Sequence, residues 1–129
     1  MPLIKVNLRK GRSKAELRSL LDTIHEVMVA AFNVPERDRY QIVYEHKSSH
    51  MHALDTGLGF ERTDKFVLIE VVSRPRKQSE KLAFYRNLAA GLESECSIAA
   101  SDIMVSFVEN TDDDWSFGGG VAQFVTGEL

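Results

Sequence analysis

The chain has 129 residues, of which 43% are hydrophobic and 27% charged, with a formal net charge of −3 at pH 7. These values are typical of one globular domain with a sizeable core, so we expect a single domain over residues 1–129. The negative charge argues against nucleic-acid binding, and no apolar run approaches the roughly 20 residues of a membrane helix.

The amino terminus reads Met1-Pro2 and continues into an apolar stretch, residues 3–6, typical of a short strand. Initiator methionine is usually removed ahead of a small residue, and its removal here would expose the secondary amine of Pro2. An α-amino group has a pKa of roughly 7.7 to 8.0, so nearby charges can tune it as a base, an acid or a nucleophile. Pro2 is therefore a candidate catalytic residue, the alternative being an ordinary strand start.

Two β-α-β patterns follow one another along the chain. The first half has a strand at residues 3–6, a helix introduced by a capping box at Ser13 and Glu16, and a strand at residues 40–44. The second half repeats this pattern with strands at residues 68–71 and 103–108. Its helix is expected to bury one face, formed by Leu82, Tyr85, Leu88, Ala89 and Leu92.

These repeats, at about residues 2–46 and 66–110, predict an α+β fold with a four-stranded mixed sheet and two helices on one face. We align them by matching Arg9 with Arg74 and Leu17 with Leu82. Residues 111–129 would form a C-terminal loop or hairpin. The second face of such a sheet stays bare, and assembly with other copies is a natural way to cover it, so we expect an oligomer.

Charged residues at the predicted strand and helix ends suggest a binding site. Arg74 and Arg76 flank Pro75, which disfavours a helical conformation at Arg74. Because a guanidinium group matches a carboxylate, the pair is a candidate anchor for a small carboxylic acid, the alternative being two solvated arginines. If Asp38 lies nearby, it would raise the pKa of the Pro2 amine while the arginines lower it. Taken alone, Asp38 is equally a turn residue.

Other reactive side chains give weaker signals. His46, His50 and His52 lie in a polar segment without a regular zinc spacing, so we expect no metal site there, and nothing in the sequence indicates another cofactor. Cys96 and His25 are expected to be packing residues. The absence of a recognisable secretory signal makes the cytoplasm the expected location, with no nucleic-acid or membrane partner.

Taken together, the order and spacing of five motifs resemble the tautomerase superfamily of amino-terminal proline enzymes. The motifs are Met1-Pro2 followed by a short strand, the doubled β-α-β unit, Val34-Pro35-x-x-Asp38-Arg39-Tyr40, Ser73-Arg74-Pro75-Arg76 and Val108-Glu109-Asn110. Within the superfamily, residues 55–59 and 114–118 are most similar to the malonate semialdehyde decarboxylases. One departure is the segment 118–121, which is less basic than this resemblance implies.

The resemblance implies a two-layer tautomerase fold, a homotrimer and a defined set of roles. It assigns Pro2 as the catalytic amine, Asp38 as the residue that positions water and tunes Pro2, Arg74 and Arg76 as carboxylate-binding residues, and Trp115 and Phe117 as an apolar pocket wall. The implied reaction is decarboxylation of malonate semialdehyde to acetaldehyde and carbon dioxide, with Pro2 acting as an acid or through a Schiff base.

Two other functions are compatible with the sequence. The same proline site could serve a tautomerase or hydratase of a small enol or unsaturated carboxylic acid. If Met1 is retained, the chain would instead be a non-catalytic binding protein, since the amine of Pro2 is never exposed.

Overall fold

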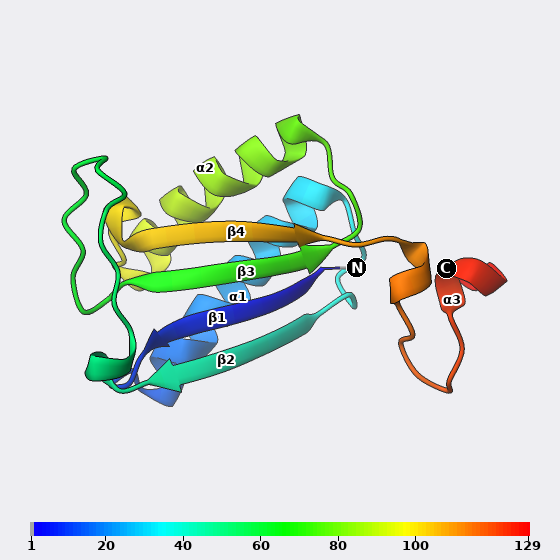
Figure 1. Cartoon of the computed structure of the whole chain (residues 1–129), viewed down its shortest axis with the longest axis horizontal. Coiled ribbons are helices and arrows are strands. Elements are labelled where there is room, and N and C mark those ends of the chain that lie inside the picture. Colours follow the sequence, from blue (N-terminus) through cyan, green and yellow to red (C-terminus); the bar gives the residue numbers. More distant parts are fainter. Residues whose placement is uncertain (1) are drawn as a thin grey trace.

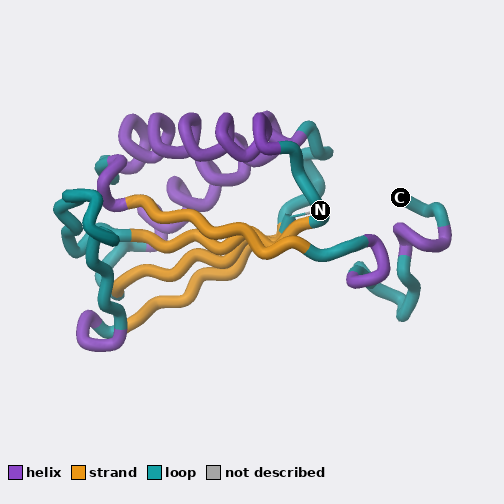
Figure 2. The backbone as a smooth tube through the Cα atoms, turned by 45° about the horizontal axis from the view of Figure 1, so that its top comes forward, coloured by secondary structure: helices purple, strands orange, loops and turns teal. Residues whose placement is uncertain are grey.

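The computed structural model describes residues 2–129, so Met1 and its expected removal lie outside the described residues. A four-stranded sheet forms one layer, and two long helices cover one of its faces (Figures 1 and 2). The elements are β1 (Leu3–Arg9), α1 (Lys14–Phe32), β2 (Tyr40–His46), β3 (Val67–Ser73), α2 (Gln78–Cys96), β4 (Ile103–Glu109) and the short α3 (Gln123–Thr126). This architecture confirms the predicted fold.

The strand order is β2-β1-β3-β4, with β1–β2 and β3–β4 parallel and the central β1–β3 pair antiparallel. Each parallel pair belongs to one β-α-β unit, so the sheet joins the two repeats through its centre. Leu3 is paired with both Tyr40 and Val72. The start of β1 therefore lies between the start of β2 and the end of β3, at one end of the sheet.

The two long helices begin in the same way. Ser13 and Glu16 form the predicted capping box at α1, in which the Ser13 Oγ accepts from the Glu16 backbone N–H at 3.1 Å. At α2, Glu80 accepts from the backbone N–H of the N-cap residue Lys77 at 2.8 Å. Because Glu80 thus occupies the place of Glu16, Leu17 corresponds to Lys81, and the predicted match of Leu17 with Leu82 is wrong. The predicted match of Arg9 with Arg74 is also wrong by one residue, since Arg9 ends β1 and Ser73 ends β3.

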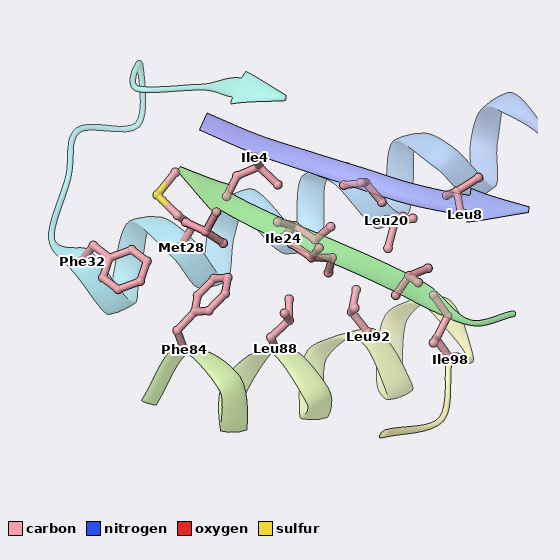
Figure 3. Close-up of a cluster of buried hydrophobic side chains, with 14 residues drawn as sticks. Ile4, Leu8, Leu20, Ile24, Met28, Phe32, Phe84, Leu88, Leu92 and Ile98 are labelled. Atoms are coloured by element: carbon pink, nitrogen blue, oxygen red, sulfur yellow. The ribbon is translucent and has the colours of Figure 1, made fainter. Parts of the chain in front are cut away.

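Between the helices and the sheet lies the hydrophobic core (Figure 3). The face of α2 that enters it is formed by Phe84, Leu88 and Leu92, none of which is measurably exposed. Leu82 is 52% exposed and Tyr85 37% exposed, so the predicted face was wrong at these two positions. Phe84 takes their place because its ring stacks on Phe32 of α1, with 5.3 Å between the ring centroids.

Replacing Leu88 with alanine is expected to lower the free energy of unfolding by about 2–5 kcal/mol, because it leaves a cavity in the core. Leu82→Ala, on the exposed side of the same helix, removes the same atoms and is expected to change it by about 0.5 kcal/mol or less. Urea unfolding followed by circular dichroism at one protein concentration would measure both. Equal losses would contradict the orientation of α2.

No long helix covers the other face of the sheet in the described residues (Figure 2). We call it the bare face; its exposed apolar side chains are Tyr40, Ile42, Tyr44, Met104 and Val108. Lys5 and Glu70 are paired in register on the two central strands of this face. Within residues 2–129, no helix is both long and apolar enough to cross a membrane.

A long segment, residues 47–66, connects β2 to β3 at the end of the sheet far from Pro2 (Figure 1). Arg9 donates to the carbonyl of Met51 at 2.8 Å, and Arg12 donates to the carbonyl of Lys65 at 2.7 Å. The buried carboxylate of Asp102 accepts from the backbone N–H of Thr63 at 2.7 Å and also from its hydroxyl. These contacts anchor the segment to the sheet.

Candidate active site

Pro2 is buried and directly precedes Leu3 at the start of β1. Because Leu3 is paired with Tyr40 and Val72, this end of the sheet also carries Asp38, ahead of β2, and the arginines that follow β3. Figure 1 shows the amino terminus beside the tips of β3 and β4, with the C-terminal segment beyond them. The structure thus brings the candidate residues from separate parts of the chain to one end of the fold.

The loop that carries Asp38 is held against α1 on both sides. The buried His25 donates from Nε2 to the carbonyl of Glu36 at 2.8 Å, and Arg39 forms an ion pair with Asp22 at 2.6 Å. The Oδ2 atom of Asp38 is buried and has no hydrogen-bond partner among the described residues. Burying a polar atom without a partner is unfavourable, so such an atom is typical of a site that binds another group.

Arg76 lies between a polar and an aromatic contact. Its Nε donates to the Ser73 hydroxyl at 3.0 Å, and its Cζ lies 5.2 Å from the centre of the Phe32 ring. Burial lowers the pKa of the Arg76 guanidinium, and the neighbouring Arg74 lowers it further, whereas the charges of Glu80 and Asp38 act in the opposite direction. Its Nη2 is buried without a partner in the described residues, so a donor is free for an anion.

Arg74 is held by the C-terminal segment. Its Nη1 donates to Asp112 in an ion pair of 2.9 Å, and its Cζ lies 3.8 Å from the centre of the Phe124 ring. The Nε of Arg74 is buried, again without a partner among the described residues. Both arginines of the predicted pair therefore keep one buried N–H group that an added acceptor could satisfy.

Aromatic rings form a wall at the same end of the sheet. Trp115 and Phe117 stack with their centroids 5.4 Å apart, and Phe117 lies 5.8 Å from Tyr40 at the start of β2. The indole N–H of Trp115 donates to the Asn110 side chain at 2.8 Å, which fixes the ring. The two residues predicted as a pocket wall are thus in contact with each other and adjacent to the strand paired with Leu3.

Two contacts of Arg74, with Asp112 and Phe124, were missed from the sequence. The available signal was the glycine run: Gly119 and Gly120 have φ of 71° and 70°, and the residues on either side of them form an antiparallel bridge. This turn reverses the chain and places Phe124 against Phe117, at a centroid distance of 5.4 Å. A glycine run indicates a turn, but it does not indicate which distant arginine the following segment meets.

Comparisons with known proteins agree on one family. Two family profiles described as tautomerase enzyme match residues 38–118 and residues 2–61. The probable tautomerase YrdN of Bacillus subtilis (strain 168) is 54% identical over 129 residues, which are 100% of both chains.

Two solved structures of malonate semialdehyde decarboxylases are also similar. One, described as the basis for decarboxylase and hydratase activities, is 49% identical with a TM-score of 0.97 and 98% of each chain covered. The other, the FG41 enzyme inhibited by 3-bromopropiolate, is 38% identical with a TM-score of 0.94, covering 98% of this chain and 97% of that one.

Proposed function

The chain belongs to the tautomerase family of enzymes, and from this premise we propose that it decarboxylates a small 3-oxo acid, malonate semialdehyde, to acetaldehyde and carbon dioxide. The observation that carries the proposal is the pair of buried N–H groups on Arg74 and Arg76, at the sheet end that bears Pro2, which have no partner among residues 2–129. Similarity to two malonate semialdehyde decarboxylases supports the choice of substrate.

In the proposed reaction, Pro2 assists the release of the electron pair from the breaking carbon–carbon bond. These electrons move toward the carbonyl oxygen of the substrate. A protonated Pro2 would stabilise that oxygen by a hydrogen bond. A neutral Pro2 would instead attack the carbonyl carbon and expel the oxygen as water, so that the resulting iminium nitrogen receives the electron pair; protonation and hydrolysis of the enamine then release acetaldehyde and the amine. Asp38 favours the protonated amine and the arginines favour the neutral one, so the local balance of charge decides the route.

The arginines and the aromatic wall would act on the carboxylate in opposite ways. Arg74 and Arg76 orient it, but tight pairing alone would stabilise the substrate more than the transition state. Trp115 and Phe117 provide an apolar surface, which favours the uncharged carbon dioxide over the carboxylate. We infer that the arginines position the substrate carboxylate, whereas the aromatic wall favours the loss of its charge as carbon dioxide forms.

A second candidate function is hydration or tautomerisation of a small unsaturated or enol acid. The buried Oδ2 of Asp38, unpartnered in the described residues, favours it, since a carboxylate in this state can hold and activate water. The name of the relative YrdN, a probable tautomerase, points the same way. The same arginines would bind the carboxylate in either reaction.

A proton NMR time course with malonate semialdehyde tests the proposal. The enzyme should be untagged, with Met1 removal confirmed by mass spectrometry. Appearance of acetaldehyde is the expected result. Absence of acetaldehyde together with conversion of phenylenolpyruvate would reject decarboxylation in favour of tautomerisation.

We further infer that the bare face is covered by two other copies of the chain in a homotrimer. Five large apolar side chains exposed on a single face are typical of a buried interface. The sequence resemblance to trimeric enzymes led to the same expectation.

Replacing Ile42 with aspartate is expected to dissociate the trimer, because it would bury an unpaired charge at the interface. Sedimentation velocity would show the loss of mass. Leu82→Asp, which places the same charge on the outer side of α2, should leave the mass at that of the wild type. A wild-type protein that sediments as a monomer would reject the trimer.

A further inference from the structure

The two arginines of the site differ in their charge environment. Arg74 forms an ion pair with Asp112, whereas Arg76 has no carboxylate within ion-pair distance in residues 2–129 and donates to the neutral Ser73 hydroxyl. Arg74 is therefore neutralised by a direct contact, whereas the charges of Glu80 and Asp38 act on Arg76 without an ion-pair contact in residues 2–129. This difference bears on how many negative charges a ligand can bring into the site.

We propose that Asp112 is a specificity-determining residue that restricts the site to ligands with one carboxylate. This inference rests on the proposed role of Arg74 and Arg76 as carboxylate-binding residues. A ligand with one carboxylate pairs with Arg76 and uses the buried Nε of Arg74 only as a hydrogen-bond donor. A second carboxylate near Arg74 would meet the negative charge of Asp112, and like charges at short range repel.

The backbone around Asp112 keeps this carboxylate near Arg74. Asp112 opens a short 3₁₀ turn, Asp112–Asp114, in which the Asp114 carboxylate accepts from the backbone N–H of Thr111 at 2.8 Å. On the other side, the Phe124 ring covers the guanidinium of Arg74 at 3.8 Å. The C-terminal segment therefore fixes both members of the ion pair.

The exposure of the Arg74 and Asp112 side chains determines how strongly Asp112 should affect the affinity for a second carboxylate. The side chains of Arg74 and Asp112 are 34% and 55% exposed, so water screens the pair and its contribution is that of a surface salt bridge rather than a buried one. We therefore expect a change of about fivefold in relative affinity when the charge of Asp112 is removed.

Isothermal titration of two unreactive three-carbon acids, propanoate and malonate, tests the proposal. Asp112→Asn should raise the affinity for malonate relative to propanoate by about fivefold. The control is Asp113→Asn, which removes the same charge from the neighbouring residue of the turn and should leave the ratio unchanged. Arg76→Ala should weaken both ligands, which would place them at the arginines.

An unchanged ratio in Asp112→Asn, or an equal change in Asp113→Asn, would overturn the proposal. Unaltered binding of both acids to Arg76→Ala would overturn it as well, since the ligands would then bind elsewhere. Because neither acid is turned over, the affinity ratio is measurable whichever reaction the enzyme catalyses. The decarboxylase assay and the affinity ratio can therefore each fail independently of the other.

Discussion

Enzyme that keeps Met1 on Pro2 is expected to lose turnover of malonate semialdehyde by a factor on the order of 10²–10⁴, the contribution of a positioned acid or base. An amide nitrogen is neither basic nor nucleophilic, so retention of Met1 removes both proposed roles of Pro2 at once. The two forms differ by one residue outside the described part of the chain, and mass spectrometry distinguishes them before each assay.

The variant Pro2→Ala tests the contribution of the terminal amine separately from that of the pyrrolidine ring. Its free terminus is a primary amine with a pKa in the ordinary range, so part of the activity is expected to remain after Met1 is removed. Circular dichroism would establish that each form is folded. Equal, measurable rates with and without Met1 would exclude the amine from the reaction, whereas no turnover in either form would leave the non-catalytic alternative.

The second large effect is expected for Arg76→Ala, which should lower kcat/KM by roughly 10²-fold. Removing one partner of a desolvated charge pair typically costs about 2–5 kcal/mol. The buried Nη2 of Arg76 has no partner in the described part of the chain, and a carboxylate can satisfy it. Arg76→Lys keeps the charge but not the planar pair of donors, so its kcat/KM should fall between that of the wild type and that of Arg76→Ala. Steady-state kinetics with malonate semialdehyde would measure all three.

Arg12→Ala is the matched control for this series. Arg12 directly precedes the N-cap of α1 as Arg76 directly precedes the N-cap of α2, but it donates to Lys65 at the far end of the sheet. Its removal should leave kcat/KM within about twofold, as expected for a distant and independent position. Unchanged kinetics in Arg76→Ala would remove that residue from the proposed site.

Local sequence patterns were sufficient to predict most of the fold. The capping box at Ser13 and Glu16 and the apolar strand predicted at residues 3–6 depend on neighbouring residues, and both appear in the structure, the strand extending to Arg9. The face of α2 was partly wrong, because a periodicity of apolar residues does not show which of Leu82, Phe84 and Tyr85 packs against a distant ring. That choice depends on Phe32, in the other repeat.

The candidate site was also predicted in part. Pro2 and Asp38 precede their strands and the arginines follow theirs, so the strand order together with the parallel β1–β2 and antiparallel β1–β3 pairings places them at one end of the sheet. Their catalytic roles stay predictions. The contacts of Arg74 with Asp112 and Phe124 depend on how the C-terminal segment folds back, a long-range arrangement that no short motif encodes.

The two repeats carry similar charged groups at opposite ends of the sheet, but within residues 2–129 these groups differ in whether their buried atoms have hydrogen-bond partners. Asp102 has its carboxylate satisfied by Thr63, and Arg12 is engaged with Lys65, while Asp38 and Arg76 each retain an unpartnered atom in the described residues. Phe66, which precedes β3 as Pro2 precedes β1, is internal to the chain and has no amine to expose. In a saturation mutagenesis experiment, substitutions at the far end should therefore reduce melting temperature, and those at the Pro2 end should reduce turnover.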